Sequence, residues 1–426
     1  MPALRPEEIR VLDQLDVAGM VAFAQELVAI PSVGGAETPA QEAVARLLAE
    51  AGLEVDVWEL DLPSLRRHPA YSSEIHRDSG LGVVGVLGED RGGRSLILNG
   101  HVDVVPAGDE SVWAVPPWSG RVEGGRLHGR GSLDMKGGLA CALFAAKAIK
   151  ESGVRLRGRL ILESVIGEED GGVGTLAAIV RGYRADGAVI MEPTGLALCP
   201  AQAGALSFRV TVRGRGAHGC VREEGVSALE KLYPVHRELL ALEARRNHFI
   251  RDPLFQGPRV PFSLSVGTVR GGDWASSVPE WVTVEGRYGL APEEDEEEAK
   301  ADFQRALDAA VEGDPWLRDH PPELEWWGGR FLPARISSSH PLVEKVGGAF
   351  LHLTGRPPVL EGVTFGSDMR LLVVDGRTPT LLFGPGDIRR AHSPDESVSV
   401  EDLEVTLRTL ALAALRFCGC EEHEST

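Results

Sequence analysis

The chain has 426 residues, of which 43% are hydrophobic and 25% charged, as in a globular protein large enough for two domains. A formal net charge of −19, with an acidic face around residues 293–298, argues against a general nucleic-acid binder, which needs a basic surface. The N-terminus lacks a signal-peptide core, no apolar run is long enough to span a bilayer, and the cysteine count of five is odd. We therefore expect a cytoplasmic protein with reduced thiols and no membrane partner.

The first part of the chain alternates predicted helices and strands. The expected order is helix 16–29, helix 38–51, strands 54–59, 81–88 and 95–100, helix 137–152, strand 158–166, helix 173–183 and strand 187–192. Residues 61–80 are polar with no clear period, and we expect a surface excursion there. The alternation predicts an α/β fold with a mostly parallel central sheet covered by helices.

The pattern changes at Ala205, where LSFRVTVRG alternates like a half-exposed strand. The next expected elements are helix 225–246, strands 262–271 and 281–290, helix 292–312 and strand 323–327. This β-α-β-β-α-β order is that of a ferredoxin-like unit, and it predicts an inserted α+β domain over residues 204–329. The catalytic domain then comprises 1–203 and 330–426, the latter with helix 340–354, strand 358–361, helix 368–375, strand 379–384 and helix 399–417.

Metal-ligand residue types recur in loops at or soon after the ends of predicted strands. They are His101 with Asp103, Asp134, Glu168 with Glu169, Glu192, and His392. Each alone has a simpler explanation, such as a helix N-cap, a solvated sheet edge or a surface imidazole. Together they would crowd carboxylates at one edge of the sheet, which is electrostatically costly without a cation. Two histidines with three carboxylates suit zinc or a similar transition metal better than calcium or magnesium.

The segments HVDVVP, GRGSLDMKGG, EED, MEPT and GPG…AHSPDE, in this order, resemble the five signature segments of the co-catalytic zinc peptidase and aminoacylase family. That family includes acetylornithine deacetylase, succinyl-diaminopimelate desuccinylase and glutamate carboxypeptidase. The resemblance implies two divalent metal ions, zinc first and cobalt or manganese as alternatives. His101 and Glu192 would hold one ion, Glu169 and His392 the other, and Asp134 would bridge both.

The same resemblance assigns roles to the two remaining carboxylates. Asp103 would fix the tautomer of His101, and Glu168 would be the general base that takes a proton from a metal-activated water and returns it to the leaving amine. Since Glu168 and Glu169 are adjacent, a turn must bring both to the site, and the flanking glycines permit one.

The inserted domain offers further candidates. His218 in GAHG is a turn histidine by its sequence alone, whereas the resemblance makes it a catalytic residue that reaches across a homodimer interface formed by the inserted lid. Arg287 in VEGRYG is either a strand-surface cation or the family's contact to a substrate carboxylate. Ser276 stands where many members have Asn, so substrate contact there is expected to differ. Gly384 and Gly386 let the backbone approach a substrate, although a plain turn also explains them.

These features favour a metal-dependent amidohydrolase that removes a small acyl group from an N-acyl amino acid or related amine. Resemblance to the acetylornithine-deacetylase-like branch, which has formylaminopyrimidine deformylase relatives, makes acetylornithine the first expected substrate. An exopeptidase or dipeptidase with the same chemistry is the alternative within the class. A non-catalytic metal-binding module is the alternative from another class, and the presence of Glu168 argues against it, since such a module has no need of a base.

Overall fold

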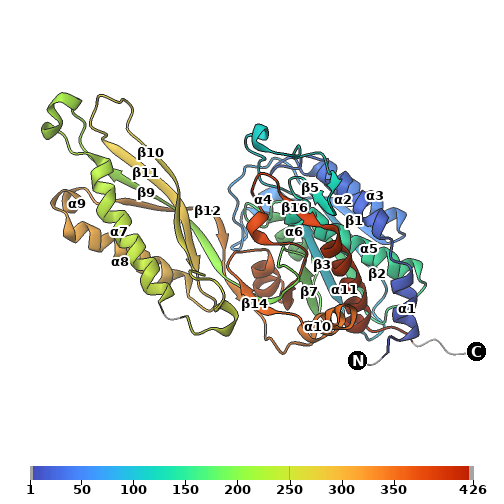
Figure 1. Ribbon diagram of the computed structural model, residues 1–426. Helices are drawn as coiled ribbons and strands as arrows, with labels where there is room; N and C mark the ends of the chain where they lie inside the picture. The colour runs from blue at the N-terminus through green and yellow to red at the C-terminus, as the bar shows by residue number, and fades with distance from the viewer. Residues whose placement is uncertain (1–2, 249, 422–426) are drawn as a thin grey trace, which may run out of the picture. The chain divides into compact units, whose positions relative to one another are not determined.

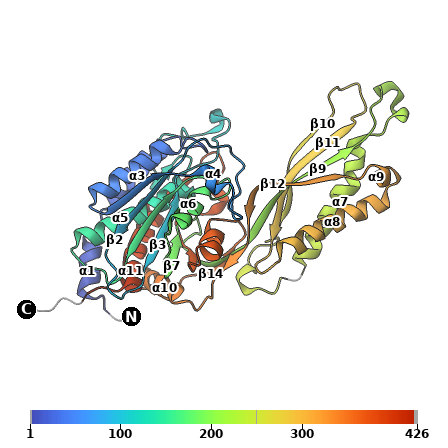
Figure 2. The ribbon, with the colours of Figure 1, turned by 180° about the vertical axis from the view of Figure 1, so that it is seen from behind.

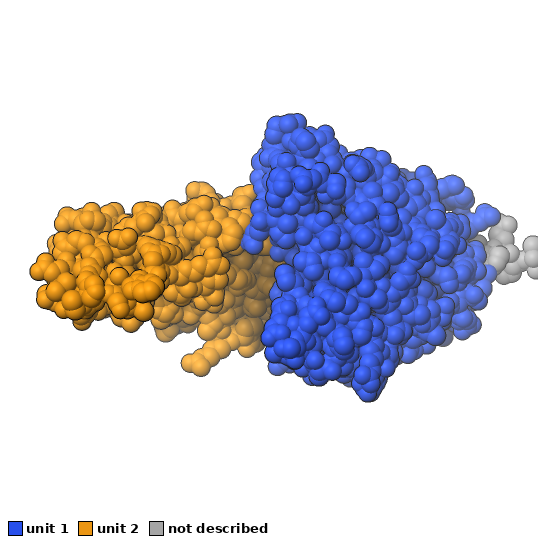
Figure 3. Space-filling model, turned by 90° about the horizontal axis from the view of Figure 1, so that it is seen from above, with its two compact units in different colours: residues 1–201, 335–361, 367–426 blue, residues 202–334, 362–366 orange. Residues whose placement is uncertain are grey.

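The computed structural model describes residues 3–248 and 250–421, and the chain divides into two compact units, coloured blue and orange in Figure 3. Unit 1 comprises residues 1–201, 335–361 and 367–426, and unit 2 comprises residues 202–334 and 362–366. Unit 2 therefore includes residues 202–203, 330–334 and 362–366, which the sequence-based boundaries assigned to the catalytic domain.

The central sheet of unit 1 has the strand order β1-β2-β6-β3-β7-β15-β8, and Figure 1 labels β1, β2, β3 and β7 of it. Its strands are β1 (Glu54–Glu59), β2 (Leu81–Leu87), β3 (Leu96–His101), β6 (Leu160–Val165), β7 (Gly187–Ile190), β8 (Leu198–Gln202) and β15 (Thr380–Leu382). Pairing is parallel from β6 through β3 and β7 to β15, and antiparallel at both flanks. The expected mostly parallel α/β sheet is thus confirmed in its centre, where β3, β6 and β7 are entirely buried, as strands covered on both faces are.

Helices cover both faces of this sheet (Figure 1, and from behind in Figure 2). They are α1 (Pro6–Asp13), α2 (Val17–Val28), α3 (Thr38–Glu50), α4 (Leu62–Leu65), α5 (Gly137–Glu151), α6 (Val173–Arg181), α10 (Pro341–Thr354) and α11 (Val400–Cys418). A Cβ on Gly100 of β3 would lie 3.2 Å from Leu139 of α5, whereas the neighbouring Asn99 donates to Oγ1 of Thr175 in α6 at 3.0 Å. Because side chains alternate along a strand, α5 and α6 lie on opposite faces.

Parts of unit 1 differ from the sequence-based expectation. Residues 61–80 are only in part the expected surface excursion: many of them are exposed, but Leu62, Leu65 and Arg77 are buried. The helix expected at 368–375 is present from residue 369, but it continues in π-helical form over Leu371–Asp375. Strand β8 and a small sheet of β4 (Val122–Glu123), β5 (Arg126–His128) and β16 (Ser397–Ser399) were not predicted. Two short strands, β13 (Ala334–Arg335) and β14 (Leu360–Val363), stand where the chain passes between the units.

Unit 2 is a four-stranded antiparallel sheet with two long helices, in the strand order β10-β11-β9-β12. Its elements are β9 (Gly204–Arg213), α7 (Ala228–Asn247), β10 (Leu264–Gly271), β11 (Trp281–Leu290), α8 (Glu296–Gly313), α9 (Pro315–Asp319) and β12 (Glu323–Phe331). The rings of Phe208, Tyr288 and Phe303 meet in its core. This chain order and pairing are those of the ferredoxin-like unit that the sequence predicts. Among the described residues, no helix combines the length and the hydrophobicity needed to cross a membrane.

Candidate metal centre

His101 is the last residue of β3 and is 1% exposed. Its Nδ1 lies 2.9 Å from the backbone carbonyl oxygen of Asp103, which can only accept, so Nδ1 carries a proton and Nε2 has the lone pair whenever the ring is neutral, as a metal-bound imidazole is. The Asp103 carboxylate is farther away, with Oδ1 3.6 Å from Nδ1. Asp103 therefore orients the ring mainly through its backbone, whereas the resemblance implied its carboxylate.

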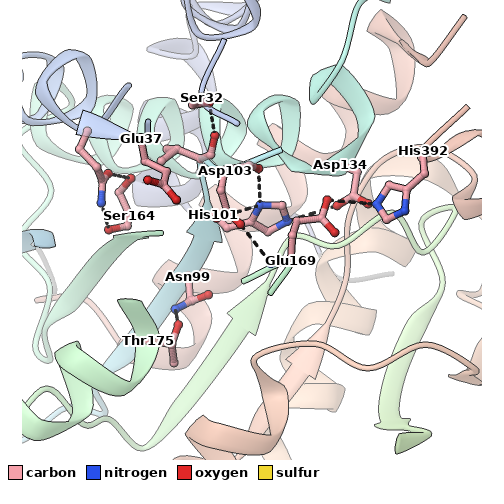
Figure 4. Close-up of polar contacts among 12 residues, drawn as sticks. Ser32, Glu37, Asn99, His101, Asp103, Asp134, Ser164, Glu169, Thr175 and His392 are labelled. Carbon is pink, nitrogen blue, oxygen red and sulfur yellow. Dashed lines mark hydrogen bonds and ion pairs between the residues drawn. The ribbon is translucent and has the colours of Figure 1, made fainter. Parts of the chain in front are cut away.

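Asp134 lies between the two predicted histidine ligands (Figure 4). Its Oδ1 is 3.2 Å from Nε2 of His101, and its Oδ2 is 3.4 Å from Nε2 of His392. The backbone N–H groups of Leu133 and Asp134 donate to Oε1 of Glu396 at 3.1 and 3.2 Å, which fixes the turn that presents Asp134. One carboxylate thus offers a separate oxygen to each half of the site.

The two adjacent glutamates point to different neighbours. Oε1 of Glu169 lies 3.0 Å from Nε2 of His392, and a ligand atom of Glu169 lies within 4.8 Å of those of His101 and Asp134. The ligand atoms of Glu168, Glu192 and His101 also lie within 4.8 Å of one another. The structure therefore brings together all five predicted ligands and the predicted base.

Burial and mutual repulsion dominate the electrostatics of these carboxylates. Burial, with the charge of Glu192 next, raises the pKa of Glu168 well above its usual range, and burial likewise raises the pKa of Glu192. Burial opposes protonation of His392, but Asp134 and Glu169 outweigh it and raise the pKa of His392 to about 11. Oε1 of Glu168 and Oε1 of Glu192 are buried without a hydrogen-bond partner among the described residues. Imidazole and carboxylate donors with unsatisfied oxygens fit divalent transition metal ions.

The two predicted substrate-binding glycines pack against the segments that carry ligands. A Cβ on Gly384 would lie 2.4 Å from the backbone oxygen of Glu192, and one on Gly386, whose φ is +82°, would lie 2.0 Å from Cδ1 of Leu133. Close packing accounts for both glycines without a substrate.

In unit 2, the structure brings two predicted segments together. His218 is exposed, its Nδ1 accepts from the backbone N–H of Cys220 at 3.2 Å, and the next residue, Gly219, donates its backbone N–H to the carbonyl of Ser276 at 2.6 Å. The ring of His218 therefore carries its proton on Nε2 when neutral.

Arg287 is half-buried on β11 of unit 2. It donates to Oγ of Ser263 at 3.0 Å and to the carbonyl of Thr364 at 2.8 Å. Burial lowers the pKa of Arg287, and no carboxylate among the described residues forms an ion pair with it. Its charge is therefore available to an anionic group.

Several supporting residues were not predicted. Glu396 lies inside the quoted AHSPDE segment, yet its bonds to the Asp134 turn and its buried ion pair with Arg130, at 2.5 Å, follow only from the structure. Arg77 pairs with Asp170 beside the glutamate turn at 2.7 Å, and the segment that contains it has no sequence pattern.

Two histidines and four carboxylates at the carboxyl edge of a largely parallel sheet form a site with the donors that divalent transition metal ions prefer. The model of the peptidase family M20/M25/M40 matches residues 97–416, and the chain belongs to this family of metal-dependent hydrolases that act on amide bonds.

Relatives cover nearly the whole chain. It is 30% identical over 429 residues to the N-formyl-4-amino-5-aminomethyl-2-methylpyrimidine deformylase of Halalkalibacterium halodurans, covering 94% of each chain. It is 30% identical over 403 residues to the succinyl-diaminopimelate desuccinylase of a Methylobacterium species, covering 90% of this chain and 92% of that one. The YXEP protein of Bacillus subtilis, described as a dinuclear metal binding peptidase from the M20 family, matches with a TM-score of 0.63 at 15% identity, covering 94% and 98%. This last likeness shows the fold.

Proposed function

We propose that the chain removes a small acyl group from an N-acyl amino acid or a related amine, with acetylornithine as the first substrate to test. The observation that carries this proposal is the buried Glu168 carboxylate, which has an unpartnered oxygen and stands beside the ligand atoms of His101 and Glu192. The relatives at 30% identity are named as a deformylase and a desuccinylase, and both names describe loss of an acyl group.

We propose that two divalent metal ions, zinc or else cobalt or manganese, occupy the site. His101 and Glu192 would hold one, Glu169 and His392 the other, and Asp134 both, in agreement with the two oxygens that Asp134 turns toward different histidines. When bound, the ions supply Lewis acidity and a water of lowered pKa. The description of the B. subtilis protein as dinuclear supports this stoichiometry.

Glu168 then performs the proton transfers. Its pKa is raised by burial, and the charge of neighbouring cations would lower it again, which suits a group that accepts a proton from water and returns it to the leaving amine. Asp103 keeps the Nε2 lone pair of His101 directed into the site by holding Nδ1.

In unit 2, Arg287 has no carboxylate partner and would bind a substrate carboxylate. His218, whose Nε2 carries the proton in the neutral ring, would donate a hydrogen bond to the oxyanion in the site of a second subunit, with Ser276 beside it. A homodimer is part of the proposal, as is a cytoplasmic location, which fits the five free cysteines.

The test is a panel of N-acetyl, N-formyl and N-succinyl amino acids, acetylornithine included, with dipeptides alongside, each assayed with zinc, cobalt or manganese. Hydrolysis of the N-acyl amino acids ahead of the dipeptides supports the proposal. Preference for dipeptides favours the exopeptidase alternative, which the family description supports. No hydrolysis of any member with both metal sites filled would favour a metal-binding module and overturn the proposal.

A further inference from the structure

The turn at residues 167–172, which carries Glu168 and Glu169, is held from one side by the segment at residues 72–77. The side chain of Arg77 is 3% exposed, and its Nη1 donates to Oδ2 of Asp170 at 2.7 Å. The same oxygen accepts from Oγ of Ser73 at 2.8 Å and from the backbone N–H of Ile75 at 3.0 Å. Asp170 follows Glu169 directly in the chain, so these three donors fix the residue next to the two glutamates.

Arg77 is itself fixed by a second carboxylate. Its Nη2 and Nε donate to Oε1 of Glu37 at 2.7 and 3.2 Å, and Glu37 is the residue directly before the first residue of α3. The guanidinium thus bridges α3 and the glutamate turn, and all three charged groups are buried. Two carboxylates sharing one planar fork of donors give a directional, charge-assisted arrangement.

The glutamate turn needs such support because its glycines leave its backbone free to adopt several conformations. Gly167, Gly171 and Gly172 have φ of +66°, +136° and +79°, a region that glycine enters at little cost. A Cβ on Gly167 would lie 3.0 Å from Cζ of Arg77, so the guanidinium packs directly against the start of the turn.

We propose that Arg77 is a positioning residue, which through Asp170 fixes the turn at residues 167–172 and thereby orients Glu168 and Glu169. The inference rests on the proposed function for the roles of the two glutamates. Arg77 touches neither glutamate side chain in the interactions described, and it acts on the turn through its ion pair with Asp170 and its packing against Gly167. The segment around residues 61–80 is in consequence part of the support of the site.

The test compares Arg77→Met, Asp170→Asn and the double variant with the wild-type protein in zinc titrations and steady-state kinetics. Misplacing a metal-ligand turn predicts an affinity for zinc about 10- to 100-fold lower and a kcat about 100-fold lower, with KM little changed. Since the two residues act as one unit, the double variant should match Arg77→Met rather than multiply the two losses.

The matched control is Arg416→Met. Arg416 donates from Nε to the buried Oε1 of Glu8 at 2.8 Å and joins α11 to α1, so its loss should lower thermal stability and leave zinc affinity and kcat unchanged. Where Arg77→Met does not give folded protein, Arg77→Lys is used instead, since lysine keeps the positive charge but lacks the planar group that donates to Asp170 and Glu37 together.

Zinc affinity and kcat within about threefold of wild type in a folded Arg77 variant would overturn the inference, as would losses that multiply in the double variant or that appear equally in Arg416→Met. Zinc affinity is measured without substrate. A wild-type protein that binds zinc and hydrolyses nothing therefore refutes the proposed function and still measures the effect of Arg77.

Discussion

The backbone N–H of Glu169 donates a hydrogen bond to Oδ2 of Asp103 at 3.0 Å. This bond joins the loop after β3 to the turn after β6. Asp103 thus does two things at once: its backbone carbonyl holds the imidazole of His101 at 2.9 Å, and its carboxylate holds the glutamate turn. Loss of its side chain should disturb the turn more than the ring.

Substitutions at Asp103 test whether its carboxylate acts on the glutamate turn rather than on the ring of His101. Asp103→Ala should lower zinc affinity about 10- to 100-fold, because the N–H of Glu169 loses its acceptor. Asp103→Asn keeps an oxygen that can accept that hydrogen bond, so its zinc affinity should fall markedly less than that of Asp103→Ala. Zinc titrations of the two folded variants decide between them, and equal losses would show that the charge of Asp103, rather than its bond to the turn, is what matters.

Metal uptake should release protons. Asp134 and Glu169 outweigh burial and hold the pKa of His392 at about 11, so the metal-free ring is protonated at pH 7, whereas a metal-bound imidazole nitrogen is not. Affinity should therefore fall as the pH is lowered, and about one proton should be released per protein from this residue. Zinc titration calorimetry in buffers of different ionisation enthalpy measures the release, and His392→Ala should reduce it. An unchanged release in that variant would contradict the assignment of His392.

A substitution at Gly384 tests whether this glycine is needed for packing or for contact with a substrate. In Gly384→Ala, the new Cβ would press on the backbone oxygen of Glu192, so the variant should lose about 1–3 kcal/mol of unfolding free energy and bind zinc more weakly. Gly348 in α10 is the control: a Cβ there meets nothing within 4 Å, and Gly348→Ala should stabilise by about 0.5–1 kcal/mol. Urea unfolding measures both. A Gly384→Ala protein of wild-type stability and zinc affinity, but altered KM, would instead indicate a direct substrate role.

His218 tests the proposed dimer. Sedimentation should show a dimer for the wild type and for His218→Ala, and the variant should lose about 10²- to 10³-fold in kcat, the usual cost of one oxyanion donor. Zinc affinity should not change, since His218 is not among the proposed ligands. A monomer with full activity would refute the cross-subunit role.

The sequence was sufficient for the elements and residues that follow a local pattern. The parallel centre of the sheet is predicted because short apolar runs alternate along the chain with segments whose apolar residues have helical spacing. Strands β1 and β11 have the expected bounds. Three of the proposed ligands, His101, Glu169 and Glu192, come at or soon after the end of such a run, whereas Asp134 and His392 were recognised from the segments GRGSLDMKGG and AHSPDE. Strand β8, with the sequence LCPAQ, was missed because a proline and a polar end interrupt its short apolar run.

The support of the site could not be predicted in the same way. The Arg77–Asp170 pair joins residues 93 positions apart, and its segment shows neither helical nor strand periodicity. Glu396 lies within a recognised segment, yet its bonds to the turn of Asp134 depend on a contact across 262 positions. Contacts of this kind depend on the fold as a whole, and no local sequence pattern predicts them.

The central claim, a metal-dependent hydrolase with Glu168 as its base, is tested most directly by Glu168→Gln. The measurement is the kcat of this variant on the best substrate of the panel, taken with metal content determined on the same sample. We predict full metal content and a kcat lower by about 10²- to 10⁴-fold, because the amide cannot accept the proton of water. Wild-type hydrolysis by a fully metal-loaded Glu168→Gln protein would contradict the account.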